Sequence, residues 1–282
     1  MSPTHSSDRI AMTRSSRLSE SHTFGGALLP AVALSLGMLS LFVTLILAAY
    51  YHHANLWLIS MMGSVMPAFY FYALGTSFTG GMLIPCAVIY YYHNANRVVV
   101  DRDGEVQNMA SLVTACVAAG ALALQGIFPM REGDSPHTVF ATIFFAFAFF
   151  HALSTSQLYL NSRSTRLRKH LPITPADNFW IRWKCYCTFA CFLFTMITVV
   201  IMAYEWLTNP LMLDLLRMQK PGPLLMVGAL MEYGVVVSLL LYFASYFHDL
   251  KHVRVLVFTP SSSTANSITS TTNITRTTAP QQ

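Results

Sequence analysis

The sequence predicts an all-α polytopic membrane protein: a six-helix transmembrane bundle with both termini in the cytosol. Three observations predict this fold class: six long apolar segments, the near absence of charge within them, and an uneven distribution of Lys and Arg between the two sides. Of the 282 residues, 54% are hydrophobic and only 10% are charged, whereas soluble domains carry about 25% charged residues. Most of the chain is therefore suited to lipid rather than to water.

The apolar segments set the order of the predicted elements. A helix of about 20 apolar residues crosses the roughly 30 Å hydrocarbon core of a bilayer. Segments of at least this length cover about residues 27–50, 68–92, 108–128, 138–160, 185–204 and 222–247. They predict a membrane domain over residues 27–257, after a polar cytosolic tail (1–26) and before a Ser- and Thr-rich tail (258–282) that is too polar to fold.

Basic residues fix the predicted orientation. Fourteen of the 17 Lys and Arg residues fall on the side that holds both termini, and only Arg131, Arg217 and Lys220 fall on the other side. Because cytosolic loops carry the excess of Lys and Arg, both termini are predicted to be cytosolic. This distribution also accounts for the net charge of +5, so we expect a lipid bilayer as partner and no nucleic acid.

Aromatic and small residues support these boundaries and the packing of the bundle. Tyr50 and Tyr51 close the first span, Tyr90–Tyr92 close the second, and Trp180 and Trp183 precede the fifth. Such amphipathic rings suit the headgroup level. The third span carries small residues at a spacing of four, which predicts close approach to a neighbouring helix; they are Ser111, Ala115, Ala119 and Ala123.

Glu232 is the only Asp, Glu, Lys or Arg residue inside the six segments. It lies about 10 residues into the sixth span, about 15 Å deep and close to the midplane. His151, Thr79 and Thr195 reach similar depths, so a contact of Glu232 with His151 or Thr79 is geometrically feasible. Three hypotheses remain open: a hydrogen-bonded carboxyl that joins helices, a ligand-facing carboxyl, and a proton or ion relay.

The segment between the fourth and fifth spans is the clearest interaction surface. Residues 161–184 contain six basic residues and one acid, Asp177. Each base beside an anionic leaflet contributes about 1 kcal/mol of attraction. We therefore predict contact with anionic phospholipid through Arg163, Arg166, Arg168 and Lys169. The same charges also serve to fix topology, and the two roles are compatible.

The sequence contains no pattern that predicts catalysis. There is no G-x-S-x-G elbow, no P-loop and no pair of carboxylates within one apolar segment, so we expect no enzyme activity, no cofactor and no metal site. Five cysteines, all in or beside apolar segments, predict packing residues and no disulfide; they are Cys86, Cys116, Cys185, Cys187 and Cys191. For Cys185 and Cys187, close to the cytosolic end of the fifth span, S-acylation is the alternative hypothesis.

Several short motifs resemble one family of membrane proteins. Ile59-Ser60-Met61-Met62-Gly63-Ser64-Val65-Met66-Pro67 is similar to the I-S-D-x-G-x-x-P-E signature of the damage-regulated autophagy modulator (DRAM) family, with Met61 and Ala68 in place of its acids. His137 and Ala141 match H-x-x-G-A, and Met231-Glu232-Tyr233 resembles its acidic-aromatic pair. Phe247-His248-Asp249-Leu250, followed by Val253, Val255 and Val257, resembles the family's ending F-x-x-D-F-x-x-V with a slight shift. The resemblance extends over about residues 27–257.

The resemblance implies a non-enzymatic six-pass protein of lysosomes or endosomes that promotes autophagy. In the wider superfamily, some relatives help to hold a phosphatidylinositol kinase at the plasma membrane, and others take part in remodelling GPI anchors. A plasma-membrane scaffold for phosphoinositide kinase recruitment is therefore the second hypothesis. A small transporter or channel using Glu232 and His151 is the third.

Overall fold

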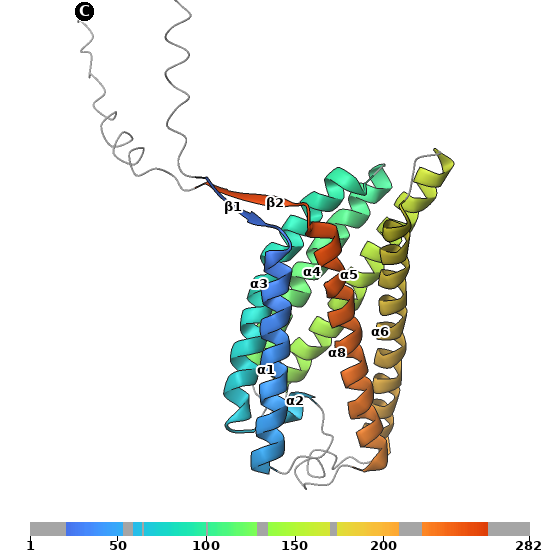
Figure 1. Ribbon diagram of the computed structural model, residues 1–282. Coiled ribbons are helices and arrows are strands. Elements are labelled where there is room, and N and C mark those ends of the chain that lie inside the picture. Colours follow the sequence, from blue (N-terminus) through green and yellow to red (C-terminus); the bar gives the residue numbers. More distant parts are fainter. Residues whose placement is uncertain are drawn as a thin grey trace, which may run out of the picture. The chain divides into compact units, whose positions relative to one another are not determined.

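The structure is a computed structural model that describes residues 21–52, 59–63, 65–99, 101–128, 135–169, 174–208 and 222–258. These residues form two compact units, a helical unit within Gly26–Val253 and a small two-stranded unit. Figure 1 shows the helical unit as a bundle of long helices that run side by side.

Helices account for almost all of the larger unit. In chain order the described helices are α1 (Leu28–His52), α2 (Ile59–Met62), α3 (Ala68–Arg97), α4 (Arg102–Ile127), α5 (Ser135–Arg168), α6 (Pro175–Thr208) and α8 (Pro223–Leu250). Within the described part of the chain, six of them are long and apolar enough to cross a membrane, and only the one-turn helix α2 is too short. The predicted six-helix membrane fold is confirmed.

The helices extend beyond the apolar segments, and this changes the predicted fourth loop. α5 continues to Arg168 and α6 begins at Pro175, so most of residues 161–184 is helical. A span predicted from hydropathy ends at the first charged residue. The helix itself can continue, because Arg and Lys are good helix formers. At the start of α6 the Thr174 hydroxyl donates to Asp177 Oδ2 (2.8 Å) and accepts from the Asp177 N–H (3.1 Å), a typical N-terminal cap.

We call the end of the bundle where α3, α5 and α8 finish the cytosolic end, following the predicted topology, and the opposite end the lumenal end. At the centre of the bundle α3 packs closely on α4. A Cβ atom on Gly80 would lie 2.5 Å from the Ala119 carbonyl oxygen and 3.0 Å from Ala123 Cβ. The prediction of close packing by small residues of this helix is confirmed for Ala119 and Ala123.

The second unit is a two-stranded antiparallel ribbon, which the sequence pattern did not predict. Strand β1 (Ser21–Gly25) pairs with β2 (Arg254–Phe258), with Ser21 opposite Phe258 and Gly25 opposite Arg254. The β-branched Val255 and Val257 favour this extended conformation. The predictions for the rest of the two tails, residues 1–20 and 259–282, lie outside the described residues.

Candidate functional site

A pocket of about 380 Å³ lies at the cytosolic end of the bundle, between α3, α5, α6 and α8. Four Lys and Arg side chains line it: Arg97, Arg163, Arg166 and Lys251. Its lining also includes the acids Asp177 and Asp249, and the histidines His93, His248 and His252. The basic groups outnumber the acids two to one, so the pocket favours an anionic ligand. We call it the cytosolic pocket.

Helix α5 positions two of these bases. Arg163 and Arg166 are three residues apart and therefore project from the same face of the helix. Arg166 Nη2 donates a hydrogen bond to the Arg97 carbonyl oxygen at 2.6 Å, which joins α5 to the end of α3. The structure divides the predicted lipid-contact set: Arg163 and Arg166 line the pocket, whereas Arg168 and Lys169 are exposed and outside its lining.

Asp249, which lines the cytosolic pocket, forms a buried ion pair with Lys184. Lys184 Nζ lies 2.9 Å from Asp249 Oδ2, and the two side chains are 0% and 6% exposed. The ammonium group also donates to Ser245 Oγ. Asp249 Oδ2 accepts from Tyr90 OH at 2.9 Å and lies 3.2 Å from Tyr159 OH. Such pairing and hydrogen bonding offset the cost of removing both charges from water.

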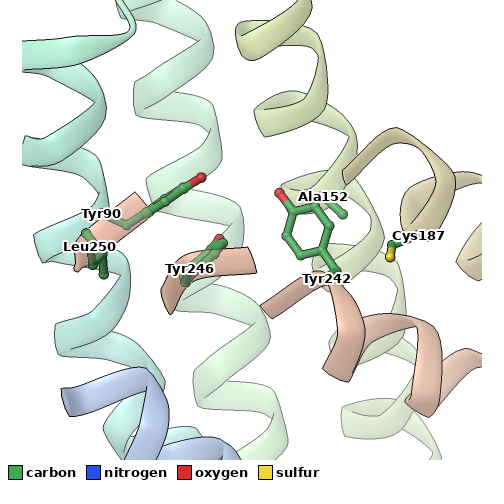
Figure 2. Packing of buried hydrophobic residues seen from close by; sticks show 6 residues of the cluster. All are labelled: Tyr90, Ala152, Cys187, Tyr242, Tyr246 and Leu250. Atoms are coloured by element: carbon green, nitrogen blue, oxygen red, sulfur yellow. The ribbon is translucent and has the colours of Figure 1, made fainter. Parts of the chain in front are cut away.

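Tyrosine rings surround the Lys184 ammonium. Its Nζ lies between 5.2 and 5.8 Å from the ring centroids of Tyr90, Tyr159, Tyr242 and Tyr246, within the range of cation–π attraction. Figure 2 shows three of these rings, with Tyr90 and Tyr246 stacked 3.9 Å apart. Tyr90 was predicted at the headgroup level but is buried, because it packs inward beneath the end of α3.

His151 belongs to the same buried polar network. Its Nε2 contacts Tyr246 OH, and its Nδ1 lies 3.0 Å from Ser111 Oγ and 2.9 Å from the Ser111 carbonyl oxygen. Ser111 Oγ in turn lies 2.8 Å from Thr155 Oγ1. Hydrogen bonds and ring contacts thus connect α4, α5 and α8 to the Lys184–Asp249 pair on α6 and α8.

Glu232 lies in a different part of the bundle from His151, so the Glu232–His151 contact that their similar depths made feasible does not form. Both ring nitrogens of His151 face Ser111 and Tyr246, whereas Glu232 Oε2 accepts a hydrogen bond from the Ile59 N–H at 2.9 Å. The carboxyl reaches towards the lumenal end because α2 packs beside α8 there (Figure 1). Thr79 and Glu232 both line a cavity within the helical bundle, whereas Thr195 of α6 does not line this cavity.

The other motif residues, apart from Asp249, lie at the lumenal end of the bundle. Gly63 packs directly on a ring, since a Cβ there would be 2.5 Å from Tyr72 Cγ. Pro67 immediately precedes α3, and Ile59, which donates to Glu232, is buried. His137 is buried at the start of α5, with Nδ1 2.8 Å from the Phe128 carbonyl oxygen. Ser60 lies in α2, but its side chain is outside the described residues.

The two cysteines predicted as acylation candidates differ in exposure. Cys187 is buried and packs in the cluster of Tyr90, Ala152 and Tyr242 (Figure 2), where no acyl group fits. S-acylation of Cys187 is therefore not supported. Cys185 is half-buried and precedes it by two residues, on a different side of α6. Acylation of Cys185 stays a prediction.

Comparison with protein-family models decides the family of this chain. The model described as "Frag1/DRAM/Sfk1/Cwh43P N-terminal domain" matches residues 25–253, which include every membrane-spanning helix of the described chain. The chain belongs to the Frag1/DRAM/Sfk1 family. Comparison with curated proteins gave no match, and comparison with solved structures gave none. The resemblance to DRAM proteins thus holds at the level of this wider family, and a multi-pass membrane protein is established.

The buried Lys184–Asp249 site of this Frag1/DRAM/Sfk1 member was not predicted. Asp249 was singled out as a motif residue, but Lys184 was counted among loop bases because it directly precedes the apolar segment that begins at Cys185. One signal was available: a Lys at the start of one span and an Asp at the end of another lie at the same membrane depth. The tyrosines that surround them gave no separate signal, since Tyr at span ends is ordinary.

Proposed function

We propose that this Frag1/DRAM/Sfk1 protein is a non-enzymatic modulator of autophagy and lysosomal membrane function. In this proposal it resides in lysosomal or endosomal membranes, and its cytosolic pocket binds the phosphate headgroup of an anionic phospholipid. The single observation that carries the binding step is the presence of Arg97, Arg163, Arg166 and Lys251 around one 380 Å³ pocket. Family membership supports the cellular role.

The chemistry of the pocket suits a phosphate ester. Arg side chains present several N–H donors in a planar fork that matches phosphate oxygens, and charge-assisted hydrogen bonds are about twice as strong as neutral ones. Arg166 is held by its bond to the Arg97 carbonyl oxygen, so less side-chain freedom is lost on binding. Of the two lining acids, Asp249 is neutralised by Lys184, which leaves Asp177 as the only unpaired negative charge described in the lining.

A second candidate function uses the same pocket. A plasma-membrane scaffold that recruits a phosphoinositide kinase would also need basic groups beside the cytosolic leaflet. The two proposals separate by compartment and by partner: the first expects lysosomal or endosomal residence, the second plasma-membrane residence. Transport through Glu232 and His151 is not proposed, because the two residues belong to separate contact networks.

The binding step is tested with the full-length protein in neutral phosphatidylcholine nanodiscs, with a water-soluble short-chain phosphatidylinositol phosphate as probe. Arg163→Gln with Arg166→Gln should weaken binding at least about tenfold, since each lost charged hydrogen bond is worth about 1.5–3 kcal/mol. The matched control is Arg168→Gln with Lys169→Gln. It also removes two positive charges, but from residues that do not line the pocket. Equal losses in the two double variants would show attraction to the surface alone and contradict a pocket.

The cellular step needs a separate measurement. Loss of the protein should lower autophagic flux, and the tagged wild-type protein should locate to lysosomes or endosomes and restore flux. The Arg168/Lys169 control should restore it, and the Arg163/Arg166 variant should not. Plasma-membrane residence, with kinase recruitment lost only in the Arg163/Arg166 variant, would support the scaffold instead. Unchanged flux together with unchanged kinase recruitment would contradict both.

A further inference from the structure

The charge balance of the cytosolic pocket is a first constraint on its ligand. Four Lys and Arg side chains line the pocket, and of its two acids Asp249 is already paired with Lys184. Only Asp177 offsets the four bases, so with neutral histidines the lining carries an excess of three positive charges. A phosphodiester is singly charged, whereas a phosphate monoester carries a charge of about −1.5 to −2 at neutral pH. The pocket therefore favours a monoester.

Asp177 is a second constraint, because it places a negative charge in a pocket that favours anions. The start of α6 holds this side chain in place: Thr174 Oγ1 donates to Asp177 Oδ2 at 2.8 Å. A carboxylate has about four lone-pair sites, so this bond leaves Asp177 able to accept from a ligand. A phosphate beside it would be repelled unless the ligand also presents a hydrogen-bond donor. The ligand therefore combines a phosphate with a donor.

A hydroxyl group suits this donor position better than an ammonium group does. An ammonium would add a positive charge to a lining that already has three in excess, and it would cancel part of the charge of the phosphate on the same ligand. A hydroxyl donates to the carboxylate without these costs, and hydrogen bonds from O–H to a carboxylate are among the strong ones. Hydroxylated headgroups are favoured over amino headgroups.

The size and the rings of the pocket indicate what carries the hydroxyl. Its volume of about 380 Å³ equals that of roughly a dozen water molecules at about 30 Å³ each, which is more than one phosphate group fills. Trp180 and His248 line the pocket with stacked rings, whose centroids are 5.1 Å apart with 24° between the planes. The negative face of an aromatic ring attracts C–H groups. These features fit a saturated, hydroxylated ring.

We propose that the cytosolic pocket selects a phosphate monoester carried on a hydroxylated ring, and that Asp177 sets this selectivity by accepting a hydrogen bond from a ring hydroxyl. The selectivity rests on the proposed function, which requires only an anionic headgroup, and it names the chemistry of that headgroup. Two sources supply this chemistry: the headgroup of a phosphorylated phosphatidylinositol, and a free inositol phosphate.

The test uses the full-length protein in neutral phosphatidylcholine nanodiscs and three water-soluble short-chain lipids. Phosphatidylinositol monophosphate has a monoester and ring hydroxyls, phosphatidylinositol lacks the monoester, and phosphatidic acid lacks the hydroxyls. Wild-type protein should bind the first at least about tenfold more tightly than either of the others, as expected for one charged hydrogen bond. Equal binding of all three lipids would overturn the proposal.

Inositol bisphosphate, which has no acyl chains, separates the two sources. If it binds as tightly as phosphatidylinositol monophosphate, the occupant is a free inositol phosphate. If it binds more weakly, the acyl chains contribute and the occupant is a lipid. Both results require that the ring and its monoester are recognised, and an inositol bisphosphate that does not compete at all would overturn recognition of the ring.

Asp177→Ala tests the selectivity itself. Loss of the repulsive charge should raise the affinity for phosphatidic acid at least about threefold, a gain that a misfolded protein could not show. Loss of the hydroxyl acceptor should lower the preference for phosphatidylinositol monophosphate over phosphatidic acid about tenfold. The control is Asp101→Ala, because Asp101 caps α4 at the same end of the bundle, through a 2.8 Å bond from the Gly104 N–H, but does not line the pocket.

Attraction by charge alone predicts the opposite change. Removal of a negative charge would then favour the more highly charged phosphatidylinositol monophosphate, and its preference over phosphatidic acid would rise in Asp177→Ala. A raised or unchanged preference would overturn the role of Asp177 and leave the proposed function standing. Equal losses of binding in the Arg163/Arg166 and Arg168/Lys169 double variants would instead contradict the proposed function, so the two failures are distinguishable.

Discussion

Lys184 of α6 and Asp249 of α8 form a buried ion pair, with Nζ 2.9 Å from Oδ2 and the ammonium fully removed from solvent. The pair joins the first turns of one membrane helix to the last turn of another. Tyr90 of α3 and Tyr159 of α5 place their hydroxyls beside the same carboxylate oxygen. Four helices therefore meet at one charge pair, directly beneath the cytosolic pocket.

Removal of Lys184 should destabilise the bundle. Lys184→Met leaves Asp249 buried without its counter-charge, and breaking a buried pair from one side costs about 3–5 kcal/mol. Thermal unfolding of the detergent-solubilised protein measures the loss. The double variant Lys184→Met with Asp249→Asn should recover part of it, and the exposed control Lys169→Met should resemble wild type. A double variant as unstable as the single one would contradict a compensated pair.

Glu232 should tolerate Gln but not Leu. The carboxylate accepts from the Ile59 N–H at 2.9 Å, and a Gln side-chain oxygen can accept the same bond, whereas Leu leaves the buried N–H unsatisfied. Glu232→Leu should lower the free energy of unfolding by about 1–3 kcal/mol, and Glu232→Gln by much less. Comparable losses for both variants in the same thermal assay would show that the negative charge itself is needed.

Neighbouring glycines in α3 should respond in opposite directions to Ala. A Cβ on Gly80 would lie 2.5 Å from the Ala119 backbone oxygen, whereas a Cβ on Gly81 meets nothing within 4 Å. Gly80→Ala should force α3 and α4 apart at a cost of roughly 1–3 kcal/mol. Gly81→Ala should stabilise the helix by about 0.5–1 kcal/mol. The unfolding temperatures of the two variants test this prediction. An unchanged unfolding temperature for Gly80→Ala would refute the close approach of α3 and α4.

Acylation, if it occurs on this helix, should depend on Cys185 and not on Cys187. Cys187 is buried against Ala152 and Tyr242, and Cys185 is half-buried at the surface of α6. Metabolic labelling with a clickable palmitate analogue should fall in Cys185→Ser and persist in Cys187→Ser. Loss of label in Cys187→Ser alone would mean that α6 rotates relative to its neighbours in the cell.

The length of the helices shows where hydropathy stops being informative. The apolar segments placed all six spans in order, but α5 and α6 both continue into residues 161–184. A hydropathy window ends where charge begins, because it measures preference for lipid and not for helix. The ribbon of β1 and β2 was missed for a related reason: its pairing joins residues more than 200 positions apart along the chain.

The candidate sites were predicted unevenly. Arg163 and Arg166 could be assigned to a phosphate-facing surface from their charge and spacing alone, but their separation from Arg168 and Lys169 required the pocket geometry.

The sequence by itself determined the membrane solvent, the number and order of the spans, and the predicted side of each loop, because these follow from where apolar and basic residues occur along the chain. It also marked Glu232 and Asp249 as unusual. Only the tertiary structure decided their partners, Ile59 for the first and Lys184 for the second. The physical reason is that depth in a bilayer can be counted along a helix, whereas the face on which two helices meet depends on the packing of every other helix.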